Sequence, residues 1–124
     1  LIAFEINDEM ADYVAATFPG VELVRGSAAN LVAFLKEHEI GEIDAVVSGL
    51  PFANFPVPVQ TAILEGVASS LKPGGYFLGF TYFHSSVVPA PHRYRAKLKK
   101  IFASVDRVAV MKNLPPAYVM RCRK

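Results

Sequence analysis

Short apolar runs alternate along the chain with segments in which apolar residues recur every three or four positions. The first pattern is typical of buried strands, and the second of helices that bury one face. Asn7 or Asp8 can cap the first helix, and Pro19-Gly20 ends it. The pattern predicts strands at 1–4, 21–24, 43–47, 76–83, 105–111 and 117–122, and helices at 8–18, 30–38, 57–71 and 92–102.

This order of elements predicts an α/β fold. Most strands are apolar on both faces, which favours a mostly parallel sheet with helices on both sides. Gly41 and Pro73-Gly74-Gly75 are expected to end helices, and residues 84–91 to form a loop. The last two strands are joined by Asn113-Leu114-Pro115-Pro116 without a helix, so we expect an antiparallel hairpin. Since there is no repeat or linker, residues 1–124 should form a single domain.

Composition narrows the class of protein. A chain with 52% hydrophobic and 19% charged residues can bury a core, which excludes disorder. A net charge of +2 does not by itself indicate a nucleic-acid binder, although basic residues gather within 92–100 and 121–124. The single cysteine, Cys122, favours a reducing compartment such as the cytoplasm. We expect no spanning helix and no signal peptide. The three histidines lack metal-ligand spacing, so we predict no metal site.

The ends of the first two strands carry candidate cofactor-binding residues. In open α/β sheets, ligands bind at the carboxyl ends of the strands. Glu5 could accept hydrogen bonds from ribose hydroxyls, and Ile6 could cover an adenine ring. The alternative is a solvated glutamate before a helix cap. Ser27 and Ala28, after the second strand, could recognise the adenine edge, or they could simply form a turn.

The third strand ends in Ser48-Gly49-Leu50-Pro51-Phe52, the most informative run. Gly49 allows a close backbone approach, and Pro51 stiffens the exit. Ser48 and the carbonyl of Leu50 could orient a substrate amine, and the face of Phe52 could stabilise a developing cation. Ser48 is also a candidate for cofactor binding. The alternative is an ordinary loop with a core phenylalanine.

Side chains beyond the fourth strand could supply a general base. Tyr82, His84 and His92 lie near the expected mouth of the site. The alternative for the histidines is a place on the surface of a loop. There is no Gly-x-Ser-x-Gly sequence, so a nucleophilic serine is not expected.

Together these segments resemble the class I S-adenosylmethionine (SAM) dependent methyltransferases. The resemblance is carried by Phe4-Glu5-Ile6-Asn7, Gly26-Ser27-Ala28-Ala29, Ser48-Gly49-Leu50-Pro51-Phe52, Leu71-Lys72-Pro73-Gly74-Gly75 and the terminal hairpin. It implies a Rossmann-like fold and SAM as cofactor. Within the family, residues 47–52, 79–82 and 113–117 look most like bacterial phospholipid N-methyltransferases. The Leu-Pro-Phe element also resembles the Asn-Leu-Pro-Tyr of ribosomal RNA adenine dimethyltransferases.

The sequence departs from the family pattern in three ways. The strand and glycine-rich Gly-x-Gly-x-Gly loop that open the family's fold are not among these residues. Ser27 replaces a common Asp, and Ser48 replaces the usual Asn or Asp. Because the chain opens at Leu1, inside an apolar run, we expect that its natural start is missing. We therefore predict a gap in the sheet between the first and third strands, and weak or absent SAM binding by these residues alone.

The resemblance implies methylation of the amine of phosphatidylethanolamine. The basic segment 92–100 would then contact anionic lipid at the inner face of the membrane, or it is an ordinary solvated face. Two rivals remain. One is an RNA adenine or small-molecule methyltransferase, and the other is a catalytically silent binding module of the same fold, which the serines at 27 and 48 favour.

Overall fold

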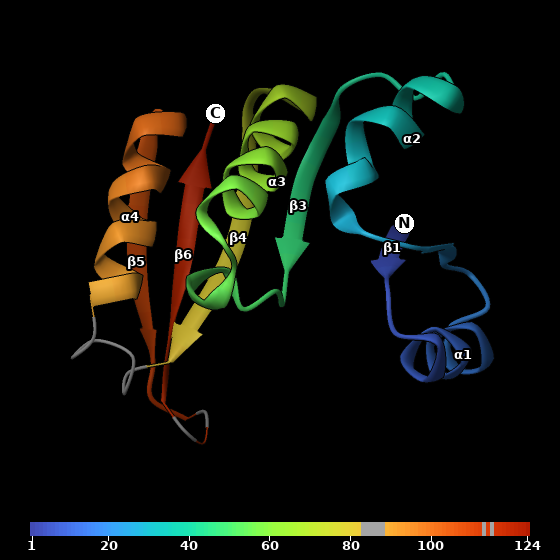
Figure 1. Cartoon of the computed structure of the whole chain (residues 1–124), viewed down its shortest axis with the longest axis horizontal. Helices are drawn as coiled ribbons and strands as arrows, with labels where there is room; N and C mark the ends of the chain where they lie inside the picture. Colours follow the sequence, from blue (N-terminus) through green and yellow to red (C-terminus); the bar gives the residue numbers. More distant parts are fainter. Residues whose placement is uncertain (83–88, 113, 115) are drawn as a thin grey trace.

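The computed structural model describes residues 1–82, 89–112, 114 and 116–124. In these residues, strands and helices alternate along most of the chain (Figure 1). The elements are β1 (Ile2–Glu5), α1 (Asp8–Thr17), β2 (Glu22–Arg25), the 3-10 turn η1 (Ala28–Asn30), α2 (Leu31–Glu37), β3 (Ile43–Ser48), η2 (Phe52–Asn54), α3 (Val57–Ser70), β4 (Leu71–Tyr82), α4 (Pro89–Ile101), β5 (Ser104–Val110) and β6 (Ala117–Arg123).

The strands form two separate sheets. Strands β1 and β2 pair in parallel, and the second sheet has the order β3-β4-β6-β5. Within it β3 and β4 are parallel, whereas β6 is antiparallel to both β4 and β5. The predicted α/β fold and terminal hairpin are therefore confirmed. Because β1 and β3 belong to different sheets, the predicted gap between the first and third strands is confirmed as well.

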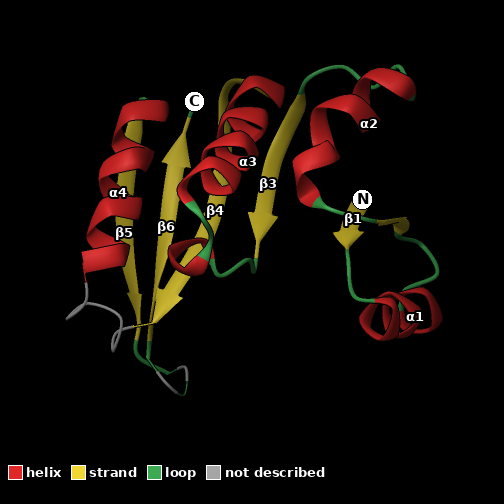
Figure 2. Ribbon diagram, in the orientation of Figure 1, coloured by secondary structure: helices red, strands yellow, loops and turns green. Residues whose placement is uncertain are grey.

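The main core lies between the four-stranded sheet and helices α3 and α4. Both helices cover the same face of that sheet (Figure 2). Leu64 of α3, Phe77 of β4 and Leu98 of α4 are fully buried. Removing each of these side chains from water stabilises the folded state by about 1.5–3 kcal/mol. On the other face, Tyr76 and Phe80 stay partly exposed. The expectation of helices on both sides is therefore wrong for this sheet in the described part of the chain.

Helix α2 connects the two halves of the molecule by packing on α3. The contact is close at Gly66, where an added Cβ would lie 3.3 Å from a methyl carbon of Val32. Helix α1 is capped by Asn7, whose side-chain oxygen accepts a hydrogen bond from the Met10 amide at 2.9 Å, as predicted. The two halves are thus joined by helix packing rather than by strand pairing.

Strand β4 begins five residues earlier than predicted, at Leu71 instead of Tyr76. Helix α3 ends at Ser70, and Pro73-Gly74-Gly75 lies within the strand rather than stopping the helix. The strand bulges here: Ile43 pairs with Leu71, but Ala45 already pairs with Tyr76. Gly74 makes the bulge possible because its φ is 79°, in the region that favours glycine. Lys124 stabilises the bulge: its carbonyl accepts a hydrogen bond from the Gly74 amide, and its amide donates one to the Gly75 carbonyl.

Two other predicted boundaries are also wrong. Helix α4 begins at Pro89 rather than at His92, because proline is well tolerated in the first helical turn, where its missing N–H needs no partner. Gly41 was expected to end α2, but the helix ends at Glu37. The left-handed residue that follows it is Glu39, with a φ of 54°, so the chain turns before it reaches Gly41.

Candidate active site

Glu5 and Ser48 end two strands that point the same way. Glu5 is the last residue of β1 and Ser48 the last of β3. In Figure 1 the arrowheads of β1, β3 and β4 all lie toward the same edge of the molecule. The structure thus brings the two groups of predicted site residues to one edge, although they belong to separate sheets.

The carboxylate of Glu5 is oriented by the start of α1. Its Oε1 atom accepts a hydrogen bond from the Asn7 amide at 2.8 Å. Its backbone carbonyl accepts one from the Gly26 amide at 2.9 Å, which holds the end of β2 beside the end of β1. Oε2 accepts no hydrogen bond within the described residues. One oxygen therefore fixes the side chain, and the other is available to a ligand hydroxyl.

The other predicted adenine contacts lie around the same strand ends. Ile6 is 74% exposed, which suits a side chain that covers a ligand ring. Ser27 is the N-cap of η1, and its hydroxyl accepts a hydrogen bond from the Ala29 amide at 3.2 Å. A serine hydroxyl that accepts in this way can still donate to a ligand. Ala28 packs against the main core, so its backbone is more available than its side chain.

The loop after β3 is held by a series of hydrogen bonds. The Ser48 hydroxyl accepts from the Leu50 amide at 3.2 Å, and the Leu50 carbonyl accepts from the Phe52 amide at 2.8 Å. The buried amide of Gln60 donates to the Phe52 carbonyl at 2.8 Å. The first two bonds lie within the loop, and the Gln60 bond ties it to α3, so its carbonyl groups have fixed directions.

Phe52 does not present an open ring face, and that expectation is wrong. Its side chain is 3% exposed. The ring of Tyr94 stacks on it with centroids 5.4 Å apart, and Phe55 and Phe77 contact it edge to face. The alternative interpretation, a core phenylalanine, is the one that the structure supports. In this arrangement the ring cannot stack on a substrate or a flipped base.

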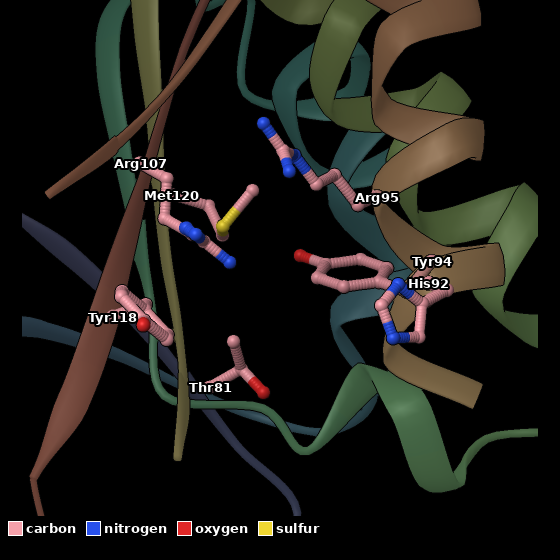
Figure 3. A pocket seen from close by; sticks show the side chains of 7 residues that line it. All are labelled: Thr81, His92, Tyr94, Arg95, Arg107, Tyr118 and Met120. Carbon is pink, nitrogen blue, oxygen red and sulfur yellow. The ribbon is translucent and has the colours of Figure 1, made fainter. Parts of the chain in front are cut away.

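The candidate bases can be placed only in part. Tyr82 pairs with Ala117 through the backbone, but its side chain lies outside the described part, as does the whole of His84. His92 stands at the start of α4 and lines a cavity between that helix and the sheet (Figure 3). Within the described residues, no three histidine, cysteine or acidic side chains are grouped as metal ligands would be.

That cavity contains residues that sequence reasoning missed. Tyr94 and Arg95 reach into it from α4, and Arg107 reaches in from β5 (Figure 3). The pKa of the Tyr94 hydroxyl is raised, mainly because burial disfavours the phenolate. The helical spacing of Tyr94, Leu98 and Phe102 marks one buried face of α4 and could have been read from the sequence. Nothing local in the sequence brings Arg107 to the same place.

The basic segment of α4 does not form one continuous cationic face. The Lys97 ammonium donates to the hydroxyl of Thr61 at 2.6 Å and to the carbonyl of Val57 at 3.3 Å, both on α3. Arg95 points into the cavity (Figure 3). The exposed cations are Arg93, Lys99 and Lys100. Within the described residues no helix is both long and apolar enough to span a membrane.

The residues at this edge fit the adenosine half of SAM. Among the described residues, Glu5 offers a carboxylate oxygen that accepts no hydrogen bond, Ile6 offers an exposed apolar surface, and nothing lies within 4 Å of where a Cβ of Gly26 would be. A carboxylate at a strand end can bind two vicinal ribose hydroxyls. The described residues contain no glycine-rich loop for the amino-acid end of SAM.

Solved structures of methyltransferases superpose on nearly the whole chain. An rRNA methylase from Streptococcus thermophilus matches 98% of it and 72% of its own chain, with a TM-score of 0.71 at 16% identity. The N-methyltransferase NodS from Bradyrhizobium japonicum WM9, in complex with S-adenosyl-L-homocysteine, matches 100% of it and 66% of its own chain, with a TM-score of 0.77 at 9% identity. The chain therefore has the class I SAM-dependent methyltransferase fold, as its sequence predicts.

One curated relative is similar in sequence. An ornithine lipid N-methyltransferase from Singulisphaera acidiphila is 31% identical over 102 residues, which are 82% of this chain. The match spans about half of that relative, 50% of its length. No profile of a known family matches the chain.

Proposed function

We propose that this chain belongs to a SAM-dependent N-methyltransferase that acts on the amine of a zwitterionic amino lipid. The observation that carries the proposal is the 31% identity to an ornithine lipid N-methyltransferase, in a chain whose Glu5 and Ser48 end strands at one edge. The sequence identity supports a lipid amine as the substrate. The shared edge would place the methyl donor and the methyl acceptor in neighbouring sites.

On this proposal the end of β1 binds the adenosine part of SAM. Glu5 accepts hydrogen bonds from the ribose hydroxyls, while its other oxygen keeps its bond to the Asn7 amide. Ile6 covers one face of the adenine, and Ser27 with the Ala28 backbone contacts its edge. When bound, SAM supplies an electrophilic methyl group.

The loop after β3 positions the acceptor amine. Ser48 and the backbone carbonyls of the loop accept its N–H hydrogen bonds and orient the nitrogen lone pair. Leu50 contributes through its carbonyl, which keeps a second lone pair beside the bond from Phe52. In methyl transfer the amine nitrogen attacks the methyl carbon as the bond from that carbon to sulfur breaks. Because this displacement depends mostly on correct positioning, a loop fixed by hydrogen bonds suits it. The amine must be neutral, and solvent or His92 would take its proton.

Two headgroups fit an amino-lipid acceptor. The sequence resemblance favours phosphatidylethanolamine, and the curated relative is an ornithine lipid N-methyltransferase. Both headgroups join a primary amine to an oxyanion, which is a phosphate in the first lipid and a carboxylate in the second. We therefore propose only the class of methyl acceptor, which is a lipid that carries an amine beside an anion. The assay below identifies which headgroup is methylated.

A lipid substrate requires contact with a membrane. The exposed Arg93 and Lys100 lie seven residues apart, on one face of α4, with Lys99 beside them. Each cation near an anionic surface contributes about 1 kcal/mol. We expect Arg93→Glu/Lys100→Glu to lose binding to anionic vesicles in co-sedimentation, whereas Lys36→Glu on α2 keeps it. Equal binding by all three proteins would remove this role, and with it the proposed location at the cytoplasmic face of the membrane.

The assay for the whole proposal offers the intact protein labelled SAM with lipid vesicles and RNA side by side. Vesicles contain either ornithine lipid or phosphatidylethanolamine. We expect label in one or both lipids and none in RNA, consistent with a Phe52 ring that is covered by Tyr94. Label in RNA alone would contradict the proposal in favour of a nucleic-acid acceptor. If no SAM binds in calorimetric titration, the chain belongs to a silent module instead.

A further inference from the structure

The cavity beside α4 is built like a site for a small anion. It has a volume of about 50 Å³ and lies between α4 and strands β4, β5 and β6. A single water needs about 10–15 Å³ of cavity volume, so a group with the size of a carboxylate or a phosphate fits.

Two residues that line this cavity, Tyr94 and Arg95, each carry a buried donor that has no partner in the described part of the chain. Within the described residues, neither the Tyr94 hydroxyl nor Nε of Arg95 has a hydrogen-bond partner, and both atoms are buried. The Tyr94 side chain is 3% exposed, and its oxygen sits over Gly79, where an added Cβ would lie 3.2 Å away. Burying a donor without an acceptor is unfavourable, so a native structure normally supplies one. An anion in the cavity would accept from both groups.

The charge of the cavity is positive. Arg95 and Arg107 enter it from opposite walls, one from α4 and the other from the sheet (Figure 3). The guanidinium of Arg107 lies 4.1 Å from the centre of the Tyr118 ring, which holds it in place. Neither arginine takes part in the ion pairs found among the described residues. Guanidinium groups bind carboxylate and phosphate in a fixed geometry, so two of them favour an oxyanion.

The cavity is next to the loop that we propose for the acceptor amine. Tyr94 forms one wall of the cavity and stacks on Phe52 of that loop. Thr81, another wall, lies near the end of β4, two residues beyond Gly79, which pairs with Ser48. An acceptor whose amine reaches Ser48 would therefore carry its anion toward Arg95 and Arg107.

We propose that this cavity binds the oxyanion of the amino-lipid headgroup and so selects zwitterionic acceptors over simple amines. The inference rests on the proposed function. Carboxylate and phosphate share the chemistry that the two arginines and Tyr94 recognise, and the test separates them.

The test uses soluble headgroup analogues that differ only in the anion. Nα-acetylornithine is compared with N-acetylputrescine, and phosphoethanolamine with ethanolamine. Each is titrated calorimetrically into the intact protein saturated with S-adenosylhomocysteine. We expect the anionic member of at least one pair to bind at least about tenfold more tightly, because two charge-assisted contacts are gained. The pair that shows the preference identifies carboxylate or phosphate.

Variants assign the preference to this cavity. Arg95→Gln and Arg107→Gln should abolish it, and Tyr94→Phe should reduce it while keeping the ring stack. The matched control is Arg121→Gln on the adjoining strand β6, whose guanidinium pairs with Asp106 rather than with the cavity. Melting curves verify that all variants fold. Equal affinity within both pairs, or a preference that survives in Arg95→Gln and Arg107→Gln, would overturn the inference. A preserved preference without methyl transfer to any lipid would instead refute only the proposed function.

Discussion

The rings of Phe52 and Tyr94 stack face to face, with centroids 5.4 Å apart and planes 7° apart. This contact joins the loop after β3 to helix α4, which also carries Arg95, one of the two arginines that line the cavity. Phe52, which was expected to face the substrate, thus stabilises the loop instead. Tyr94 contacts both the loop, by stacking on Phe52, and the cavity, of which it forms one wall.

The hydroxyl and the ring of Tyr94 should contribute differently to stability. Tyr94→Ala removes a buried ring and should lower the free energy of unfolding by about 3–5 kcal/mol. Tyr94→Phe removes only a buried donor that has no partner among the described residues, so stability should change by less than about 1 kcal/mol or increase. Urea denaturation measures both values. A Tyr94→Phe variant as unstable as Tyr94→Ala would show that the hydroxyl is already satisfied in the free protein.

Replacing the charge of Glu5 should weaken SAM binding without unfolding the protein. Glu5→Gln keeps an oxygen that can accept from the Asn7 amide but loses the charge offered to the ribose. Since a hydrogen bond to a charged group is worth about 1.5–3 kcal/mol, Kd should rise roughly 10- to 100-fold in calorimetry. Glu22→Gln, at the far end of β2, is the control. Unchanged affinity in Glu5→Gln would exclude Glu5 from the cofactor site.

Gly49 tests whether a ligand approaches the loop backbone. Among the described residues only Phe80 would lie within 4 Å of an added Cβ, at an ordinary contact distance of 3.7 Å, so Gly49→Ala should fold with stability changed by less than about 1 kcal/mol. Methyl transfer should nevertheless fall at least about tenfold, because the new methyl group occupies space needed by the ligands. Gly41→Ala, where no atom of the described residues lies within 4 Å of the added Cβ, should keep full activity. Full activity in Gly49→Ala would mean that the glycine serves no ligand.

Alkaline pH should destabilise the fold through Cys122. Burial, and to a lesser extent the nearby Asp106, raise the pKa of the thiol from 9.0 to about 12. Because the folded state keeps a proton that the unfolded state releases, stability is complete below pH 9 and falls as the pH rises toward 12. Burial of Tyr94 acts in the same direction.

The measurement for this prediction is urea denaturation at pH 8 and pH 10.5. The free energy of unfolding should fall by roughly 1–2 kcal/mol more in the parent protein than in Cys122→Ala. At pH 8 the folded protein should also resist thiol reagents, since the side chain is buried. Rapid labelling of the native thiol, or an identical pH response in the variant, would be inconsistent with a buried Cys122.

The order of elements could be predicted from the sequence because it depends on local patterns. Apolar runs and caps such as Asn7 place the strands and helices close to their observed bounds. The start of β4 could not be predicted in the same way. Gly74 and Gly75 look like a helix stop locally, but they form a bulge that is stabilised by Lys124, fifty residues away along the chain.

The candidate site was predictable only where residues follow one another at a strand end. Glu5 and Ser48 end their strands as expected. The burial of Phe52 depends on Tyr94, and the cavity combines Arg95 of α4 with Arg107 of β5. Such contacts form only through the tertiary packing of distant segments, so neither spacing nor composition indicates them.

The most direct test of the account is the mass of the lipid headgroup after incubation with the intact protein and SAM. Vesicles that contain ornithine lipid and phosphatidylethanolamine serve as acceptors, and fragment spectra locate any added methyl group. The account predicts one or more methyl groups on the headgroup amine of at least one lipid, and far less product from Glu5→Gln. Unmodified headgroups in the presence of a protein that binds SAM would contradict it.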